Sequence, residues 1–224
     1  MARRREEAEE RVLERGEISL MYRPRVEHWQ PEDVGDVQRL LLVLCPERRA
    51  RYRVIAIGRK RLPDGARHER FWGYVDLVLD SPTDLKAALG AHTYNTKTRA
   101  LRHLPAARNA ARGWYQLTWH DGHAHLKFDL GQIESNDPVV EDLRIEPSAN
   151  YIVTVANPDL TVWGLGEPPR LQFELFDETE IHVTIPSPFP PPLQARFGDR
   201  RFVQMDSVAY LDHPGAELVF VANP

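Results

Sequence analysis

The sequence predicts an α+β fold that is rich in β-structure, with mainly antiparallel hairpins in one or two sheets and a few short helices. Several segments alternate apolar and polar residues with a period of two, which is typical of strands with one buried face. The 18 prolines favour turns and short elements over long helices. Hydrophobic residues make up 42% and charged residues 28% of the chain, proportions that are typical of a folded domain.

The N-terminal segment MARRREEAEERVLER has the composition of a charged helix over residues 1–16, ending at Gly16. Its arginines lie at the N-terminal end of that helix, where they oppose the helix dipole, and its apolar stripe is narrow. We therefore expect this helix to be frayed.

A basic, β-rich half is expected over residues 17–130. A first strand is predicted around residues 18–22, where apolar residues occupy alternate positions. The apolar run 38–44 and the segment 52–58 predict a hairpin near the centre of a sheet. Residues 70–79 predict another strand of this half.

One short helix is predicted directly after that strand. Ser81 has the residue type of an N-cap, Pro82 suits the first helical position, and Gly90 ends the helix. Residues 91–112 are expected to be basic and irregular.

The best-defined hairpin is predicted over residues 114–130, with a two-residue type I′ turn at Asp121-Gly122. This turn makes one face of the hairpin apolar and the other polar, and a shift of one residue would mix the two faces. The expected cross-strand pairs are His120/His123, Thr118/His125, Gln116/Lys127, Trp119/Ala124, Leu117/Leu126 and Tyr115/Phe128.

Residues 131–149 are expected to form an acidic connection to a second, acidic β-rich half over residues 150–224. In this half we expect a strand at 151–156, a second alternating hairpin at 171–185 and a closing strand at 217–221.

The charge is unevenly distributed, although the net value is only −4. Residues 48–70 contain nine basic and two acidic residues, and residues 97–112 contain five basic and no acidic ones. Residues 129–180 contain twelve acidic and two basic residues. One hypothesis is that the two halves pair, within the chain or head to tail between chains in a homo-oligomer.

Another hypothesis assigns the basic stretch to binding. Arginines interleaved with aromatic residues suit phosphate contacts and base stacking. We therefore predict a non-enzymatic binding protein whose anionic partner is a phosphate-bearing ligand or an acidic protein surface. Nucleic acid is not favoured, because the acidic half would repel a long polyanion. The predicted anion-binding residues are Arg59, Lys60, Arg61, Arg67, Arg70 and Trp72.

The alternative hypothesis is a metal-dependent enzyme. Two histidines separated by one residue on a strand project from the same face and can bind one divalent metal ion, and a carboxylate can complete the set. The polar face of a solvent-exposed hairpin explains the same residues without a metal. The candidate ligands are His120, His123, His125 and Asp129.

Several function classes are excluded or lose support. The chain has no Walker A loop, no Gly-x-Gly-x-x-Gly after a strand, no Gly-x-Ser-x-Gly and no His-Glu-x-x-His, so no catalytic residue is assigned. The single cysteine, Cys45, rules out an intrachain disulfide and a Cys-rich metal site. No segment has the length and hydropathy of a membrane helix or of a secretion signal, so the expected compartment is the cytoplasm.

Four segments together resemble a widespread family of uncharacterised prokaryotic proteins. They are residues 22–26 (YRPRV), 36–39 (DVQR), 57–63 (IGRKRLP) and 70–73 (RFWG). The resemblance extends over most of the chain after residue 16, and it implies a whole intracellular bacterial protein. It implies no activity.

Overall fold

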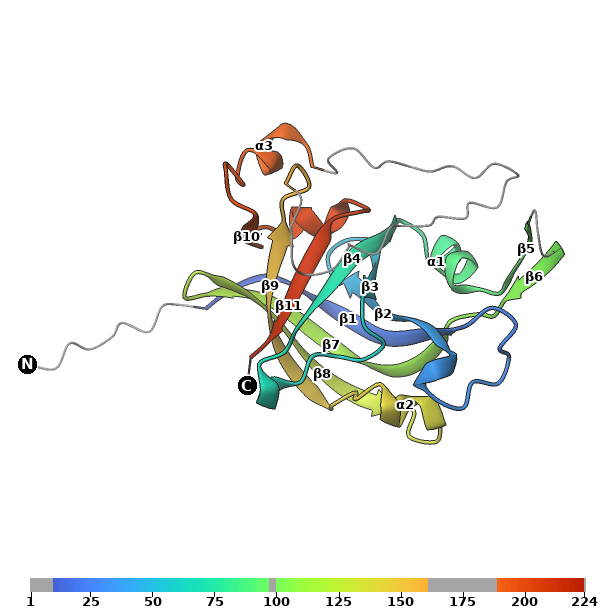
Figure 1. Cartoon of the computed structure of the whole chain (residues 1–224). Helices are drawn as coiled ribbons and strands as arrows, with labels where there is room; N and C mark the ends of the chain where they lie inside the picture. Colours follow the sequence, from blue (N-terminus) through green and yellow to red (C-terminus); the bar gives the residue numbers. More distant parts are fainter. Residues whose placement is uncertain (1–9, 97–99, 161–188, 224) are drawn as a thin grey trace, which may run out of the picture.

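The computed structural model describes residues 10–96, 100–160 and 189–223, and they form a closed β-barrel of eight antiparallel strands with one additional strand (Figure 1). In order around the barrel, the strands are β1 (Arg11–Pro24), β2 (Val37–Pro46), β3 (Tyr52–Ile57), β4 (Arg70–Leu79), β11 (Glu217–Ala222), β9 (Ser148–Ala156), β8 (His123–Ile133) and β7 (Arg108–His120), which pairs with β1. The additional strand β10 (Phe202–Gln204) pairs with β9 beyond the point where β8 begins.

The other described elements are short. A separate two-stranded sheet contains β5 (His92–Thr96) and β6 (Ala100–Leu104). The helices are α1 (Pro82–Leu89), α2 (Pro138–Asp142) and α3 (Pro191–Gln194), and the 3-10 turns are η1 (Val34–Asp36), η2 (Gly65–Arg67) and η3 (Val208–Asp212). None of these helices is long and apolar enough to cross a membrane.

The predicted α+β class is wrong, because the fold is mostly β-structure. The physical reason is that the sheet closes on itself. A closed sheet supplies both sides of its own core, so it needs no helical layer. The described helices have eight, five and four residues and cover only the barrel ends and one patch of its outer wall.

The barrel interior is filled by inward side chains, among which the aromatic residues are Tyr22, Phe71, Tyr115, Phe128, Tyr151 and Phe220. One end of the barrel is closed by α2 and the residue after it, through buried Val139, Val140 and Leu143. Leu193 of α3 and Tyr210 and Leu211 of η3 are buried in the same cluster, and η3 immediately precedes the start of β11 at the opposite end (Figure 1). The interior is therefore a packed core.

A second apolar cluster lies outside the barrel. Leu41 and Val43 of β2, together with Val54 of β3, pack with Leu85 and Leu89 of α1. Strands β2 and β3 are consequently apolar on both faces, which explains the continuous hydrophobic run that predicted a central hairpin. That hairpin is confirmed by the pairing of β2 with β3.

The predicted helix over residues 1–16 is wrong for the part that the structure describes, because residues 11–16 begin β1. Arg11 pairs with Trp119 of β7, and Gly16 pairs with both Tyr115 and Pro46. Strand pairing on both sides thus outweighs the local helix propensity. Gly16 does not end a helix; it allows β1 and β2 to approach, because a Cβ at this position would lie 2.1 Å from the carbonyl oxygen of Cys45.

The hairpin at residues 114–130 is confirmed with its register. All six expected cross-strand pairs are present between β7 and β8. Asp121 and Gly122 have φ angles of 50° and 79°, as a type I′ turn requires. The helix after β4 is confirmed as α1, whose N-cap Ser81 accepts hydrogen bonds from the amides of Thr83 and Asp84 at 3.1 and 3.4 Å.

The expectation of irregular structure at residues 91–112 is wrong, since this segment contains β5, β6 and the start of β7. Its strands are half exposed and lack a regular apolar alternation, so periodicity did not reveal them. The hairpin expected at 171–185 lies outside the described residues.

The basic and acidic halves share one barrel. β9 pairs with β8, and β11 pairs with β4, so strands of residues 150–224 complete a sheet begun by residues 17–130. The acidic connection is shorter than expected, because β8 extends to Ile133 and β9 begins at Ser148.

Candidate functional sites

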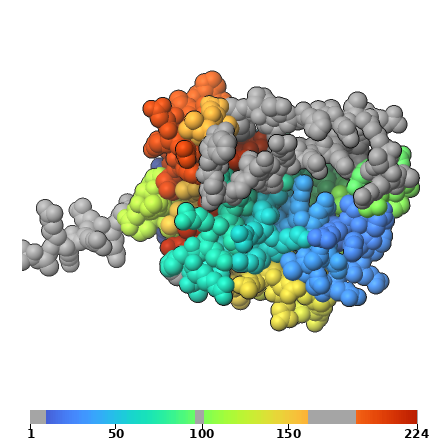
Figure 2. All heavy atoms as spheres, viewed as in Figure 1, coloured from blue at the N-terminus to red at the C-terminus, as the bar shows by residue number. Residues whose placement is uncertain are grey.

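The connection between β3 and β4, residues 58–69, contains most of the predicted anion-binding residues. It is anchored at both sides, because the Gly58 amide donates to the Trp72 carbonyl at 2.7 Å and the Leu62 amide donates to the Leu143 carbonyl at 3.4 Å. Figure 2 shows this connection, in teal, on the molecular surface above the yellow segment that contains α2. These hydrogen bonds hold the loop backbone, and with it the attachment points of the cationic side chains, in a defined position.

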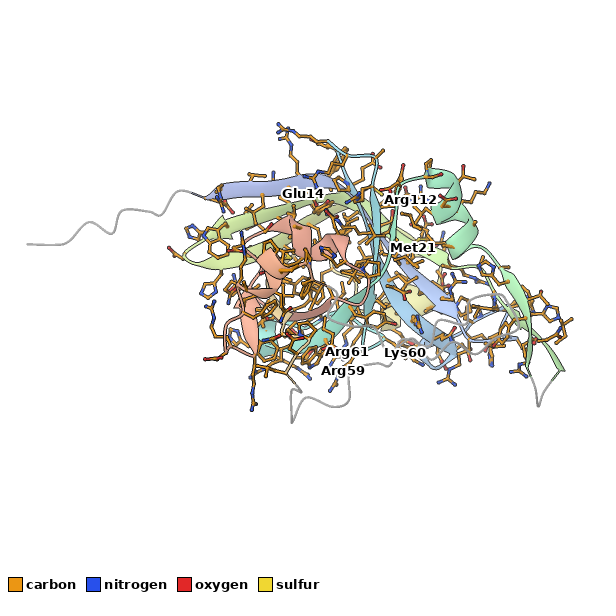
Figure 3. All side chains as sticks on the ribbon, turned by 90° about the horizontal axis from the view of Figure 1, so that it is seen from above. Glu14, Met21, Arg59, Lys60, Arg61 and Arg112 are labelled. Carbon is orange, nitrogen blue, oxygen red and sulfur yellow. The ribbon has the colours of Figure 1, made fainter. Side chains whose placement is uncertain are left out.

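Two arginines of this loop lie against the same aromatic ring. The guanidinium carbons of Arg59 and Arg61 are 5.0 and 4.7 Å from the centroid of the Phe71 ring. The Phe71 side chain is buried in the barrel core, so the ring cannot move easily. Cation–π contacts of this kind hold a guanidinium in place. Figure 3 shows Arg59, Lys60 and Arg61 together, distant from Glu14 and Arg112 in that view.

Two of the six predicted residues are neutralised by carboxylates within the loop. Arg61 forms a bidentate pair with Glu69, with nitrogen–oxygen distances of 2.5 and 2.8 Å. This hydrogen bonding lowers the pKa of Glu69 to about 2. Arg67 forms an ion pair with Asp64 at 3.5 Å. Arg61 and Arg67 therefore contribute little net positive charge.

Three other predicted cations have no carboxylate partner among the described residues: Arg59, Lys60 and Arg70. The Lys60 ammonium lies 3.5 Å from the carbonyl oxygens of Val34 and Gly35, and partial burial lowers its pKa. Arg59 and Arg70 are exposed. The unpaired charge of the loop is thus concentrated on these three residues.

Trp72 differs from the rest of the predicted set. It lies two residues after Arg70 on β4 and is half-buried, with its ring centroid 5.8 Å from that of Phe202. Its ring contacts Phe202 of β10, whereas Arg59 contacts Phe71.

Most backbone amides of the loop already donate hydrogen bonds within the protein. Amides of Gly58, Leu62, Asp64, Ala66, Arg67, His68 and Glu69 all donate hydrogen bonds within the protein. Phosphate sites in proteins commonly use clustered unpaired amides. The amides of Arg59, Lys60 and Arg61 donate no hydrogen bond within the described structure, so backbone donors are available beside the side chains at this point of the loop.

The predicted metal ligands do not converge. The ring centroids of His120 and His123 lie 6.4 and 6.5 Å from that of His125, but Asp129 is four residues beyond His125 on β8, roughly 13 Å away at the rise of a strand. His125 is buried, and its Nδ1 lies 3.1 Å from Oδ1 of Asn150. The described part of the chain holds no group of three or more His, Cys, Asp or Glu residues that suits a metal ion. The metal-dependent enzyme stays a prediction without an assembled site.

A groove of about 630 Å³ lies on the barrel wall formed by β7, β8 and β9, borders Pro63 and Gly65 of the β3–β4 loop, and was not predicted from the sequence. The polar and aromatic residues that line it include Trp114, Gln116, Lys127, Asp129, Ser148 and Asn150. A signal was present in the sequence, because the predicted register continues to Trp114 opposite Asp129 and so places a tryptophan on the polar face of the hairpin.

No family model, no curated protein and no solved structure matches the chain. The resemblance to uncharacterised prokaryotic proteins therefore stays a prediction.

Proposed function

We propose that this is a non-enzymatic binding protein that holds an acidic protein surface through Arg59, Lys60 and Arg70. The observation that carries the proposal is the position of Arg59. Its exposed guanidinium lies 5.0 Å above the ring of buried Phe71 and has no carboxylate partner in the described structure. A cation held in place before binding loses less conformational entropy when a partner arrives.

The charge of the surrounding segment supports an acidic partner. Residues 58–70 contain five basic and two acidic residues, which leaves a net charge of +3. A positive patch of this kind steers an oppositely charged surface toward itself and makes the association dependent on salt.

The exposure of Arg59 and Arg70 favours a protein surface over a small phosphate-bearing ligand. A small phosphate needs several converging donors, whereas carboxylates spread over a surface can each pair with one exposed cation. The groove on β7–β9 is lined by none of the predicted cations.

The test compares two triple variants with the same change in charge. R59Q/K60Q/R70Q removes the proposed contacts, and R48Q/K86Q/R112Q removes three exposed cations elsewhere on the molecule. Retention on immobilised polyglutamate is measured against salt concentration. We expect the first variant to elute at lower salt with a weaker salt dependence, and the control to elute much closer to the wild type.

Equal losses in the two variants would show that retention follows net charge alone and would overturn the proposal. Saturable binding of inorganic phosphate that the first variant abolishes would instead favour a phosphate-bearing ligand. The head-to-tail assembly stays a separate prediction, and a molecular mass that falls as salt rises would support it.

A further inference from the structure

The groove on β7, β8 and β9 has an ordered floor. The strand register aligns Trp114 with Asp129 and Ser148 in one row, and Gln116 with Lys127 and Asn150 in the next. Neighbouring strands are about 4.8 Å apart, so each row spans roughly 10 Å, which is close to the length of one or two sugar rings. The groove is therefore long enough for a small polar ligand.

Trp114 is the aromatic feature of this floor. It is 56% exposed, whereas Tyr115 and Leu117 on the same strand are buried. A β-bulge next to it changes the register between Arg112 and Trp114. A β-bulge changes the direction in which the neighbouring side chains point. Gly113 is required at the bulge, because a Cβ there would lie 1.9 Å from the carbonyl oxygen of Asp129.

The charges around Trp114 do not suit an anion. Lys127 is neutralised by a short ion pair with Glu10, and this hydrogen bond lowers the pKa of Glu10. Asp129 and Glu146, which also lines the groove, have no ion-pair partner among the described residues. The unpaired charge in the groove is therefore acidic, in contrast to the β3–β4 loop.

The polar groups supply both donors and acceptors. Oδ1 of Asn150 contacts Nδ1 of His125 at 3.1 Å, which leaves its amide hydrogens directed elsewhere. Gln116 and Ser148 are exposed and can donate or accept hydrogen bonds. The carboxylates of Asp129 and Glu146 accept hydrogen bonds from hydroxyl groups and are stronger acceptors than neutral oxygens.

We propose that this groove binds a neutral carbohydrate. The face of a pyranose ring presents weakly positive C–H groups, which are attracted to the electron-rich face of an indole. Trp114 would stack against that face, while Asp129 and Glu146 accept hydrogen bonds from ring hydroxyls and Asn150 donates to a hydroxyl oxygen. The volume of about 630 Å³ lies within the range of small-ligand pockets. The groove borders the basic loop at Pro63 and Gly65, but none of the proposed anion-binding side chains lines it, so this inference does not rest on the proposed function.

The test titrates the full chain with methyl glucoside, methyl galactoside, methyl mannoside and the disaccharide cellobiose at millimolar concentrations, followed by saturation-transfer NMR. We expect at least one of these sugars to bind the wild type. Trp114→Ala should weaken that binding about tenfold or more through lost stacking, and Asp129→Asn should weaken it less. The matched control is Trp29→Ala, which removes another tryptophan that is 52% exposed but lies outside the groove, and it should bind as the wild type does.

Thermal unfolding of each variant establishes that it is folded, which we expect because both tryptophans are exposed. Failure of all four sugars to bind, or equal binding by W114A and the wild type, would overturn the proposal. Saturable binding of tetramethylammonium that W114A abolishes, without sugar binding, would show a cation site instead and would also overturn it.

Discussion

The two ends of strand β3 place arginines from one basic stretch in opposite environments. Where β3 begins, Arg53 is fully buried and bonded to carboxylates from two distant parts of the chain. Where β3 ends, Arg59 is exposed above the Phe71 ring and has no described carboxylate partner. The comparison shows that a run of positive charge in a sequence does not by itself define a binding surface.

The network around Arg53 is closely packed. Its Nη1 donates to Oε1 of Glu14 at 2.6 Å, and its Nε donates to Oδ1 of Asp212 at 2.8 Å. Its Nη2 lies 2.7 Å from the same Asp212 oxygen as an ion-pair contact without a hydrogen bond. The Tyr115 hydroxyl donates to Glu14 at 2.8 Å, and burial is the main cause that raises the pKa of Tyr115.

Asp212 also forms ion pairs with two neighbouring arginines. Arg51 and Arg49 lie 3.2 and 3.5 Å from its second carboxylate oxygen. This part of the basic stretch is therefore paired with an aspartate from the other half of the chain, as the charge-pairing hypothesis expects for contacts within one chain. Among the cations of residues 58–70, only Arg61 and Arg67 have a carboxylate partner in the described structure.

The largest expected effect comes from Arg53→Met. Glu14 and Asp212 would remain in the interior without their cation, and breaking a buried pair in this way costs about 3–5 kcal/mol of unfolding free energy. Urea unfolding at pH 7 measures it. The control is Arg49→Gln, an exposed partner of the same Asp212, which should cost at most about 1 kcal/mol. If R53M lost as little unfolding free energy as R49Q, the proposed contrast between the two ends of strand β3 would be wrong.

An intermediate effect is expected from Glu69→Gln, which would release Arg61 from its bidentate pair. We expect this variant to elute from polyglutamate at higher salt than the wild type, because one more cation becomes available. Glu141→Gln makes the same change in net charge without releasing an arginine, so it is the control and should increase retention less. Unchanged or weaker retention of E69Q would contradict the proposal that this loop binds an acidic surface.

The contribution of the Arg61–Glu69 pair to the stability of the protein depends on pH. The pKa of Glu69 is lowered from its usual 4.5 to about 2, so the unfolded chain binds the proton first as pH falls. Its contribution to stability is fully present above about pH 4.5 and is lost as pH falls toward 2. E69Q should show a shallower decline of stability over that window.

The smallest effect is expected at His125, which is buried like Arg53 but has a neutral partner, Asn150. Burial is the main cause that lowers the pKa of His125 below 6.5. The unfolded state therefore takes up a proton more readily, and the wild type should lose stability as pH falls through and below 6.5. His125→Gln should reduce this loss, as measured by unfolding at pH 7.5 and 5.5. Identical slopes for both proteins would show that His125 is not desolvated.

Local elements were predictable where neighbouring residues decide them. The Asp121-Gly122 turn and the alternation around it determine the register of β7 and β8, and Ser81 with Pro82 determines the start of α1. The candidate loop was predictable to the extent that its cations are adjacent in sequence. The pairing of Arg61 with Glu69 is also local, since only eight residues separate them.

Other features depended on contacts between distant residues. Residues 11–16 have a helical composition but form part of β1, because β7 and β2 provide strand partners about a hundred and about thirty residues away. Closure of the barrel requires β8 to pair with β9 and β4 to pair with β11. No local periodicity encodes such pairings, since they depend on the burial of both sheet faces by the whole chain.

The sequence by itself determined the strand-rich character of the protein, the register of its best hairpin and the location of its excess positive charge. These properties follow from turn geometry, side-chain periodicity and composition, which act over a few residues. The tertiary structure alone decided that the sheet closes, that Arg53 is buried between Glu14 and Asp212, and that Arg59, Lys60 and Arg70 have no carboxylate partner in the described residues. The physical reason is that a charge is neutralised, or left available, by groups that only folding brings within a few ångströms.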